Sequence, residues 1–209
     1  MQITSDVYAL DSTARSYAYL VLGPEPTLID TSLPGSSAKI LEEMREIGLE
    51  PSQLKHIVLT HHDVDHIGSA SALRDATGAT LWASQLDLPY ILGERRRPGV
   101  KRLAEMLVKV PTPMIDKTYD DEGGSLPLEV IPTPGHTPGH AAFLYRDILF
   151  AGDLVTSKGM MLRPAPNMLT WDHTVLKASL RAVGTRQFEW VCPAHGQPIR
   201  RGQLWNQFV

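Results

Sequence analysis

The sequence has little that would place the protein in a membrane, in an oxidising compartment or on nucleic acid. Cys192 is the single cysteine among 209 residues, so no disulfide can form within the chain, and we expect a reducing compartment. No apolar run approaches the ~20 residues that span a bilayer, and the first residues lack the basic and apolar blocks of a secretory signal. The net charge of −3 offers no basic surface for nucleic acid. We therefore expect a cytoplasmic protein that acts on a small molecule, without a nucleic-acid or membrane partner.

What the chain does have is a dense group of metal-ligand residue types. The apolar run 57–59 leads into residues 60–68, THHDVDHIG, which hold three histidines and two aspartates. An apolar run that ends in such a cluster indicates a buried strand leading into a site. Imidazole and carboxylate groups bind divalent transition metals. Without a cation, the packed carboxylates would repel each other and lose hydration, so we interpret the segment as part of a metal centre.

Three later segments carry further candidate ligands, each after a strand-like run. His136 and His140 lie in PGHTPGH, Asp153 follows the apolar run 148–150, and His195 follows the run 190–191. Ligands that recur at strand ends are typical of a sheet that presents a metal site on its edge loops.

The order and spacing of these segments resemble the metallo-β-lactamase fold hydrolases. The signature of that superfamily is HxHxDH, a histidine in a GHT turn, an aspartate after a strand and a late GHG, and the match runs from Asp30 to His195. The resemblance implies an α/β fold, a four-layer αββα sandwich of two mixed sheets flanked by helices. It implies two divalent metal ions, one held by His61, Asp63 and His136, the other by Asp65, His66 and His195, with Asp153 bridging both. It also implies that Asp30 and His140 support the ligands and that Asp65 and Asp153 take part in catalysis.

The second histidine of the signature is Asp63 here, so the motif reads HxDxDH. Aspartate is shorter than histidine, adds a negative charge and replaces a nitrogen donor with a hard oxygen donor. We infer a preference at this position that tilts from zinc towards manganese or iron.

The length and the 43% hydrophobic content suit one domain over residues 1–209. The patterning predicts helices over about 36–48, 67–76 and 174–183. It predicts strands over 3–10, 16–22, 27–29, 55–60, 81–83, 126–131, 141–150 (with a turn at Arg146-Asp147) and 188–192.

Residues 85–116 are predicted to form a helical insertion between Pro/Gly-marked loops. Its apolar stripe either packs on the body of the domain or covers the site as a lid, and a contact in a homodimer also stays open. Methionines after Asp153 suggest that a flexible apolar loop lies nearby. The expected substrate pocket is lined by Leu103, Met106, Leu107, Met160, Met161 and Met168. The run Arg95–Arg97 is predicted to be a solvated face.

Two metals that share a water can hold it as hydroxide for direct attack on a carbonyl or phosphoryl group. No nucleophilic side chain is expected, because Ser69 does not lie in a G-x-S-x-G elbow and Cys192 follows a buried strand. The apolar segments favour hydrolysis of a carboxylic ester or lactone with an apolar acyl part. Thioester and phosphodiester or phosphotriester hydrolysis are the alternatives. A di-iron redox protein related to the flavodiiron proteins, which carry an acidic residue at the position of Asp63, and a relative with an inactive site remain less favoured.

Overall fold

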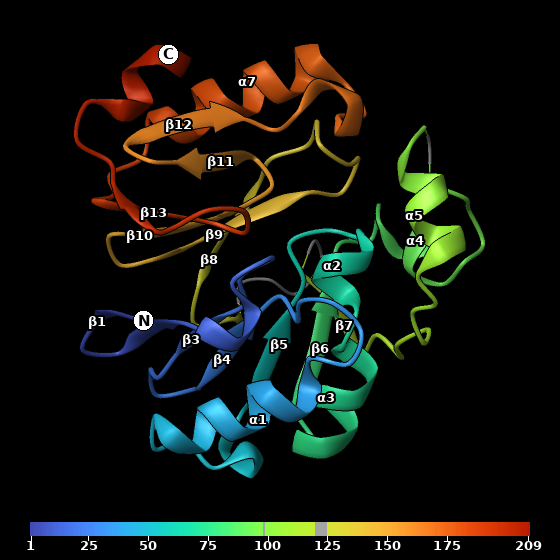
Figure 1. Cartoon of the computed structure of the whole chain (residues 1–209). Coiled ribbons are helices and arrows are strands. Elements are labelled where there is room, and N and C mark those ends of the chain that lie inside the picture. Colours follow the sequence, from blue (N-terminus) through green and yellow to red (C-terminus); the bar gives the residue numbers. More distant parts are fainter. Residues whose placement is uncertain (98, 120–124) are drawn as a thin grey trace.

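Two β-sheets lie face to face, and helices cover their outer sides (Figure 1). The computed structural model describes residues 1–97, 99–119 and 125–209, with the backbone alone for 103–105. The first sheet runs in the order β1 (Gln2–Thr4), β2 (Val7–Ala9), β3 (Tyr19–Val21), β4 (Thr27–Ile29), β5 (His56–Val58), β6 (Thr80–Ala83) and β7 (Lys117–Thr118). The second runs in the order β14 (Ile199–Arg200), β13 (Trp190–Pro193), β10 (Ile148–Gly152), β9 (Ala141–Tyr145) and β8 (Glu129–Pro132). A separate hairpin pairs β11 (Val155–Lys158) with β12 (Met161–Pro164).

The helices complete a sandwich of four layers. The first sheet is covered by α1 (Ser37–Glu46) and α3 (Ala70–Thr77), and the second by α7 (His173–Gly184) and the 3-10 helix η5 (Leu204–Phe208). The remaining short helices are α2 (Val64–Ile67), α4 (Leu88–Ile91), α5 (Lys101–Leu107), η1 (Asp11–Thr13), η2 (Pro51–Gln53) and η4 (Asn167–Leu169). This is the αββα architecture expected from the sequence. None of the described helices has the length and apolar character needed to cross a membrane.

In the central strands β5 and β10, successive side chains point alternately into two apolar cores. In β5, Ile57 faces the core beneath α1 and α3, whereas Val58 faces the core between the sheets. In β10, Leu149 faces α7, whereas Ile148 and Phe150 face the first sheet. This two-residue period is what a strand with both faces buried requires.

Parallel pairing places the ends of several strands at one edge. In the first sheet β4, β5 and β6 are parallel neighbours, and in the second sheet β10 is parallel to β13. Parallel strands end on the same side of a sheet, so the loops that follow β4, β5, β10 and β13 come together. These loops carry the candidate ligands.

Two of the predicted elements are divided in the structure. Residues 3–10 form two strands, β1 and β2, joined by a turn in which Thr4 Oγ1 donates to Asp6 Oδ1 at 3.0 Å. The helix expected after His66 is interrupted at Gly68 and Ser69, which separate α2 from α3. Gly68 lies against the backbone of Leu33 and Pro34, and this close approach requires a residue without a side chain.

The segment 85–116 contains α4 and α5, which lie at one side of the molecule beside α2 (Figure 1). Its end is fixed by Asp116, which accepts hydrogen bonds from Arg74 and from the backbone nitrogen of Leu81. Packing on the domain, one of the alternatives for its apolar stripe, is not seen at Met106 and Leu107, which are 72% and 76% exposed.

Replacing Gly68 with alanine should destabilise the fold, because the new methyl group overlaps the backbone of Leu33 and Pro34. Overpacking of this kind costs about 1–3 kcal/mol, and we expect the upper part of that range in urea unfolding. Gly159→Ala is the matched control, since φ is +59° there but nothing lies within 4 Å, so only about 1 kcal/mol of backbone strain is expected. Equal losses in the two variants would contradict the close packing at Gly68.

Candidate metal centre

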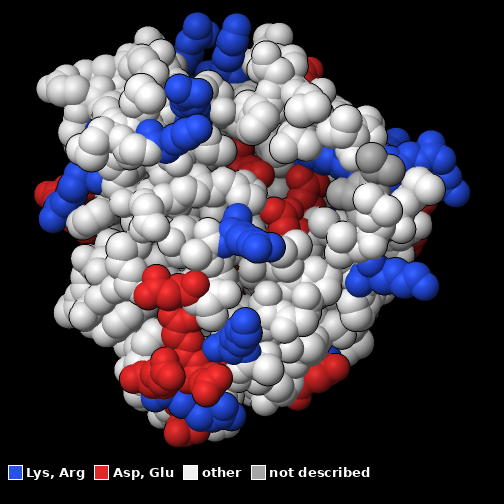
Figure 2. Space-filling model, viewed as in Figure 1, with Lys and Arg blue, Asp and Glu red and all other residues white. Residues whose placement is uncertain are grey.

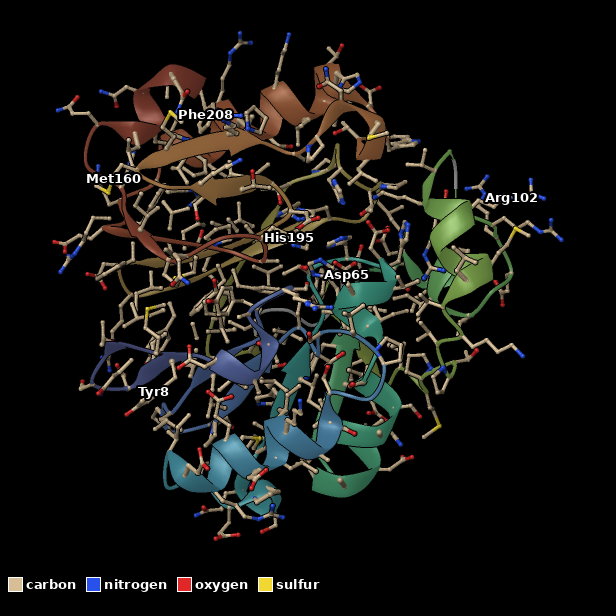
Figure 3. All side chains as sticks on the ribbon, in the orientation of Figure 1. Tyr8, Asp65, Arg102, Met160, His195 and Phe208 are labelled. Atoms are coloured by element: carbon tan, nitrogen blue, oxygen red, sulfur yellow. The ribbon has the colours of Figure 1, made fainter. Side chains whose placement is uncertain are left out.

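The seven predicted ligands meet in two adjoining groups at the convergent strand ends. The ligand atoms of each group lie within 4.8 Å of one another; the first group is His61, Asp63, His136 and Asp153, and the second is Asp65, His66 and His195. Asp65 and His195, from the two halves of the sandwich, face each other in the centre of Figure 3. Acidic side chains are visible within the central hollow of Figure 2.

Asp153 follows β10 and faces both groups. Its Oδ2 lies 3.4 Å from His136 Nε2 in the first group. Its Oδ1 lies 3.5 Å from His66 Nε2 and 3.4 Å from His195 Nε2 in the second. One carboxylate therefore directs one oxygen to each group, as the predicted bridging role requires.

Asp63 lies within the first group despite its short side chain. Its Oδ2 lies 3.0 Å from His136 Nε2 and 3.4 Å from His61 Nε2. In the second group, Asp65 Oδ2 lies 3.2 Å from His195 Nε2. Both motif aspartates thus direct an oxygen at histidine nitrogens of their own group.

Three of the ligand histidines are oriented through the nitrogen that faces away from the centre. His66 Nδ1 lies 2.8 Å from Asp30 Oδ2, His195 Nδ1 lies 2.9 Å from Arg15 O, and His61 Nδ1 lies 3.0 Å from Thr60 Oγ1. The first two acceptors hold a proton on Nδ1, so the other ring nitrogen, Nε2, is directed inward. Outer hydrogen bonds of this kind fix the tautomer and orientation of metal-binding histidines.

Asp30 is the acceptor that links two loops of the first sheet. Besides His66, its carboxylate accepts from Thr60 N and Thr60 Oγ1, both at 2.7 Å. It adopts φ +59° directly after β4 and is buried. The structure thus places Asp30 in the supporting position that the sequence analysis expected.

His140 has a different arrangement from the ligand histidines. Its Nε2 accepts a hydrogen bond from the backbone nitrogen of Asp153 at 3.1 Å, so its Nδ1 carries the proton that is donated to Thr133 Oγ1 at 2.8 Å. Burial lowers the pKa of His140 to about 3, which keeps the ring neutral. His140 therefore positions the Asp153 loop and has no free lone pair for a cation.

The donor set fits a pair of divalent cations. Within the described part of the chain, His61 Nε2, His66 Nε2 and Asp153 Oδ1 are buried without a hydrogen-bond partner. Unpaired buried polar atoms are costly, and several that converge on one point call for a shared ligand. Imidazole nitrogen and carboxylate oxygen are the donors that zinc, iron and manganese accept.

The protonation of these groups reflects their mutual proximity. Burial alone would raise the pKa of Asp153, but the positive charge of His66 and His195 holds it well below its usual range. Burial would lower the pKa of His195, yet Asp153 and Asp65 raise it to about 11. The protein on its own thus balances the carboxylates with protons, the role that metal cations would take over.

Asp87 is an anchoring residue that the sequence analysis missed. Its carboxylate accepts from His62 N at 3.0 Å, Thr137 Oγ1 at 2.9 Å and Gly139 N at 2.8 Å, and it lies 3.0 Å from His62 Nδ1. It thereby joins the first motif to the GHT turn. His62 is buried and stacks on Tyr90 with ring centroids 4.4 Å apart.

The segment 85–116 contributes two cations to the centre. Arg97 is buried and donates to the carbonyl of His62, so the prediction of a solvated face is wrong at this residue, while Arg95 and Arg96 are exposed. Lys101 is buried against Asp63 and His136. Arg97 ends a run of three arginines and Lys101 begins a helix, and no local pattern at either position shows what the side chain contacts. Only the path of the folded chain reveals these two contacts.

Two cavities of about 110 Å³ each adjoin the centre and share Lys101 and Leu169. One is lined by Asp63, Val64, Asp65, Arg97, Val100, Asp153 and His195. The other is lined by His62, Gly99, His136, Thr137, Pro138, Met168, Thr170 and Trp171.

The expected pocket lining differs from these walls. Met168 lines the second cavity, as predicted. Met106, Leu107, Met160 and Met161 are each more than half exposed and line neither cavity, because α5 and the β11–β12 hairpin turn these side chains outward. Met160 lies at the far edge in Figure 3. The side chain of Leu103 lies outside the described residues.

The model of the metallo-beta-lactamase superfamily matches residues 13–195. The chain belongs to this superfamily. It is 31% identical to the probable metallo-hydrolase YflN of Bacillus subtilis, over 92% of this chain and 84% of that protein. It is 35% identical to a hydroxyacylglutathione hydrolase of Albidiferax ferrireducens, over 60% of this chain, and the matched region spans 43% of that enzyme. The crystal structure of TTHA1623 in a di-iron-bound form superposes with a TM-score of 0.73 at 28% identity, covering 93% of this chain and 94% of that one.

Asp87→Asn should lower the free energy of unfolding at pH 7 by about 2–3 kcal/mol, because charge-assisted buried hydrogen bonds are lost. Burial would raise the pKa of Asp87, but His62, Thr137 and Gly139 hold it below its usual value. A carboxylate whose pKa is lower in the folded protein stabilises the fold at pH values above its pKa in the unfolded chain, which is about 3.9. That stabilisation is lost as the pH falls below this value. The difference between the variant and the wild type in urea unfolding should therefore shrink below about pH 4.

The exposed Asp75 provides the control, since Asp75→Asn should change stability by no more than about 0.5 kcal/mol. A stability loss for Asp87→Asn that stays constant from pH 7 down to the acid limit would show that its charge does not support the loops.

Proposed function

We propose that this protein is a metal-dependent hydrolase that cleaves a carboxylic ester or lactone with a small apolar acyl part. The main observation in support is the convergence of two ligand groups on Asp153, next to a cavity with an apolar wall. The superfamily membership and the relative described as a probable metallo-hydrolase support a hydrolytic reaction.

We assign two roles to the side chains of the centre: most would bind the cations, and one would transfer a proton. Two cations bound at the centre would acidify a shared water and polarise the substrate carbonyl. Asp65 is the most exposed carboxylate of the set, at 27%, and it lines the cavity beside Arg97 and Lys101. We assign to Asp65 the orientation of the attacking water and the acceptance of its proton, which later passes to the leaving oxygen.

The second cavity provides the place for the acyl group. Pro138, Met168, Leu169 and Trp171 form its apolar wall, and it meets the centre at Lys101 and His136. An acyl chain in this cavity would bring its carbonyl carbon to the border with the carboxylates. The small volume of about 110 Å³ favours short acyl chains.

A thioester is the second candidate substrate. The hydroxyacylglutathione hydrolase relative supports it, and the chemistry of the centre suits either a sulfur or an oxygen leaving group. We also infer that Asp63 favours iron or manganese in the first group. The structural neighbour with a di-iron centre supports this inference.

The metal-loaded protein should hydrolyse p-nitrophenyl acetate, short lactones or the matched thioacetate, and should leave bis-p-nitrophenyl phosphate intact. Asp153→Asn and His195→Ala should lower kcat/KM by ~10²-fold or more, the loss expected when a group that stabilises the transition state is removed. His173→Ala is the control, because this exposed histidine begins α7 outside the centre. Absence of turnover on all three acyl substrates would refute the proposal.

Protein purified without added metal should contain iron or manganese when its metal content is measured by inductively coupled plasma mass spectrometry. Asp63→His should shift the content towards zinc, because imidazole nitrogen replaces a hard oxygen donor. Wild-type protein that holds zinc alone at two per chain would contradict the assigned preference.

A further inference from the structure

Lys101, the first residue of α5, reaches into the first ligand group from the segment 85–116. Its Nζ lies 2.7 Å from Asp63 Oδ2, 3.0 Å from His136 Nε2 and 3.3 Å from His136 O. Its side chain is 7% exposed, so these contacts replace almost all of its hydration. The first two atoms are the ones that Asp63 and His136 direct at the metal centre.

A cation and the ammonium group cannot both use His136. An imidazole Nε2 has one lone pair, which either accepts an N–H hydrogen bond or binds a metal ion. The contact between Lys101 Nζ and His136 Nε2 therefore excludes a cation from that nitrogen. Repulsion between two positive charges at such a short distance adds to this exclusion.

The lysine also balances the unusual residue in the motif. Asp63 brings a negative charge where the superfamily signature has a neutral histidine, and Lys101 forms an ion pair with that charge. Buried charges are retained in proteins chiefly when they are paired. The substitution at residue 63 and the lysine of the insertion thus form one matched pair.

We propose that Lys101 is an internal competitor for the first cation site, formed by His61, Asp63, His136 and Asp153. A metal ion enters this site only when the ammonium group leaves His136 and Asp63. The affinity of the first group for a cation is therefore lower than its four ligands alone would provide, and residue 101 sets how readily this site is loaded.

The surroundings of α5 allow such a displacement. Lys101 borders both cavities, so its side chain has space on either side. Among the described side chains of α5 and the residue before it, the apolar Val100, Met106 and Leu107 are between 44% and 76% exposed, so these three contribute little to holding the helix on the domain. Segments with few buried apolar contacts open at low cost in free energy.

The direct test is a zinc titration of metal-free protein in competition with a chromophoric chelator. His195→Ala serves as the background because it disables the second group, so the first group dominates the titration. On that background Lys101→Met should tighten zinc binding by about tenfold or more. Arg102→Met is the matched control, because Arg102 is a neighbouring cation on α5 that is exposed and points outward (Figure 3).

Arg102→Met should leave the zinc affinity unchanged. An unchanged or weaker zinc affinity in Lys101→Met would overturn the proposal, because Lys101 would then have no effect on cation binding or would assist it. Equal tightening in both variants would overturn it too, because a general charge effect would then explain the gain.

A second readout follows the lysine itself. Acetic anhydride labelling with peptide mass spectrometry should find Lys101 protected in metal-free protein and modified several-fold faster once zinc is added. Lys39, exposed on α1, should react equally in both states. Continued protection of Lys101 in the zinc-loaded protein would contradict displacement.

These measurements do not depend on turnover. The proposal requires only that the first group binds a cation, so it survives if no ester or thioester is hydrolysed. Conversely, if the protein hydrolyses these substrates but its zinc affinity is the same with lysine or methionine at residue 101, the proposed function stands and this inference is refuted.

Discussion

The centre depends on the orientation of its imidazole rings, and Asp30 fixes the orientation of His66. A carboxylate that accepts from Thr60 N, Thr60 Oγ1 and His66 Nδ1 fixes the end of β5 and the short helix α2 in one arrangement. Asp30 adopts a left-handed backbone conformation to do so, which costs about 1–2 kcal/mol for a residue with a side chain. Three short, buried hydrogen bonds to a charged group offset that cost.

The second half of the centre relies on a different kind of support. Asp153 and His195 come from parallel strands β10 and β13, and backbone contacts hold their loops in place. Ser157 N donates to His195 O at 3.0 Å, so the β11–β12 hairpin supports the loop of the last histidine. The ligand geometry therefore comes from two independently built sheets that meet at one edge, and neither sheet supplies a complete ligand set.

The candidate ligands could be predicted because their signal is local. Polar residues packed into short segments after apolar runs mark strand ends, and parallel strands bring such ends together. The four layers followed from the resemblance. Most strands of both sheets were located to within a few residues, but β7, β14 and the β11–β12 hairpin were not predicted, and the turn at Asp6 divides the first predicted strand. A polar turn of two residues within an alternating pattern does not distinguish one long strand from a tight hairpin.

The parts that could not be predicted depend on long-range contacts. Asp87 precedes α4 and Lys101 begins α5, and nothing near them in the sequence shows what they touch. The methionines were predicted to line a pocket from their chemistry alone, but orientation decides their role. Met168 borders a cavity although it is 71% exposed, while Met160 and Met161, on β12 and its turn, border neither cavity. The same residue type thus serves two purposes within ten positions.

The segment between Asp87 and Asp116 is fixed at both ends. Asp87 ties its start to the first motif and the GHT turn, and Asp116 ties its end to Arg74 and Leu81. Because both ends are held, a change in the length of the chain between them should cost little loop-closure entropy and leave these two anchors in place. A change in the length or sequence of this segment would also move Lys101, and through the proposed competition it would alter how the first cation site is loaded.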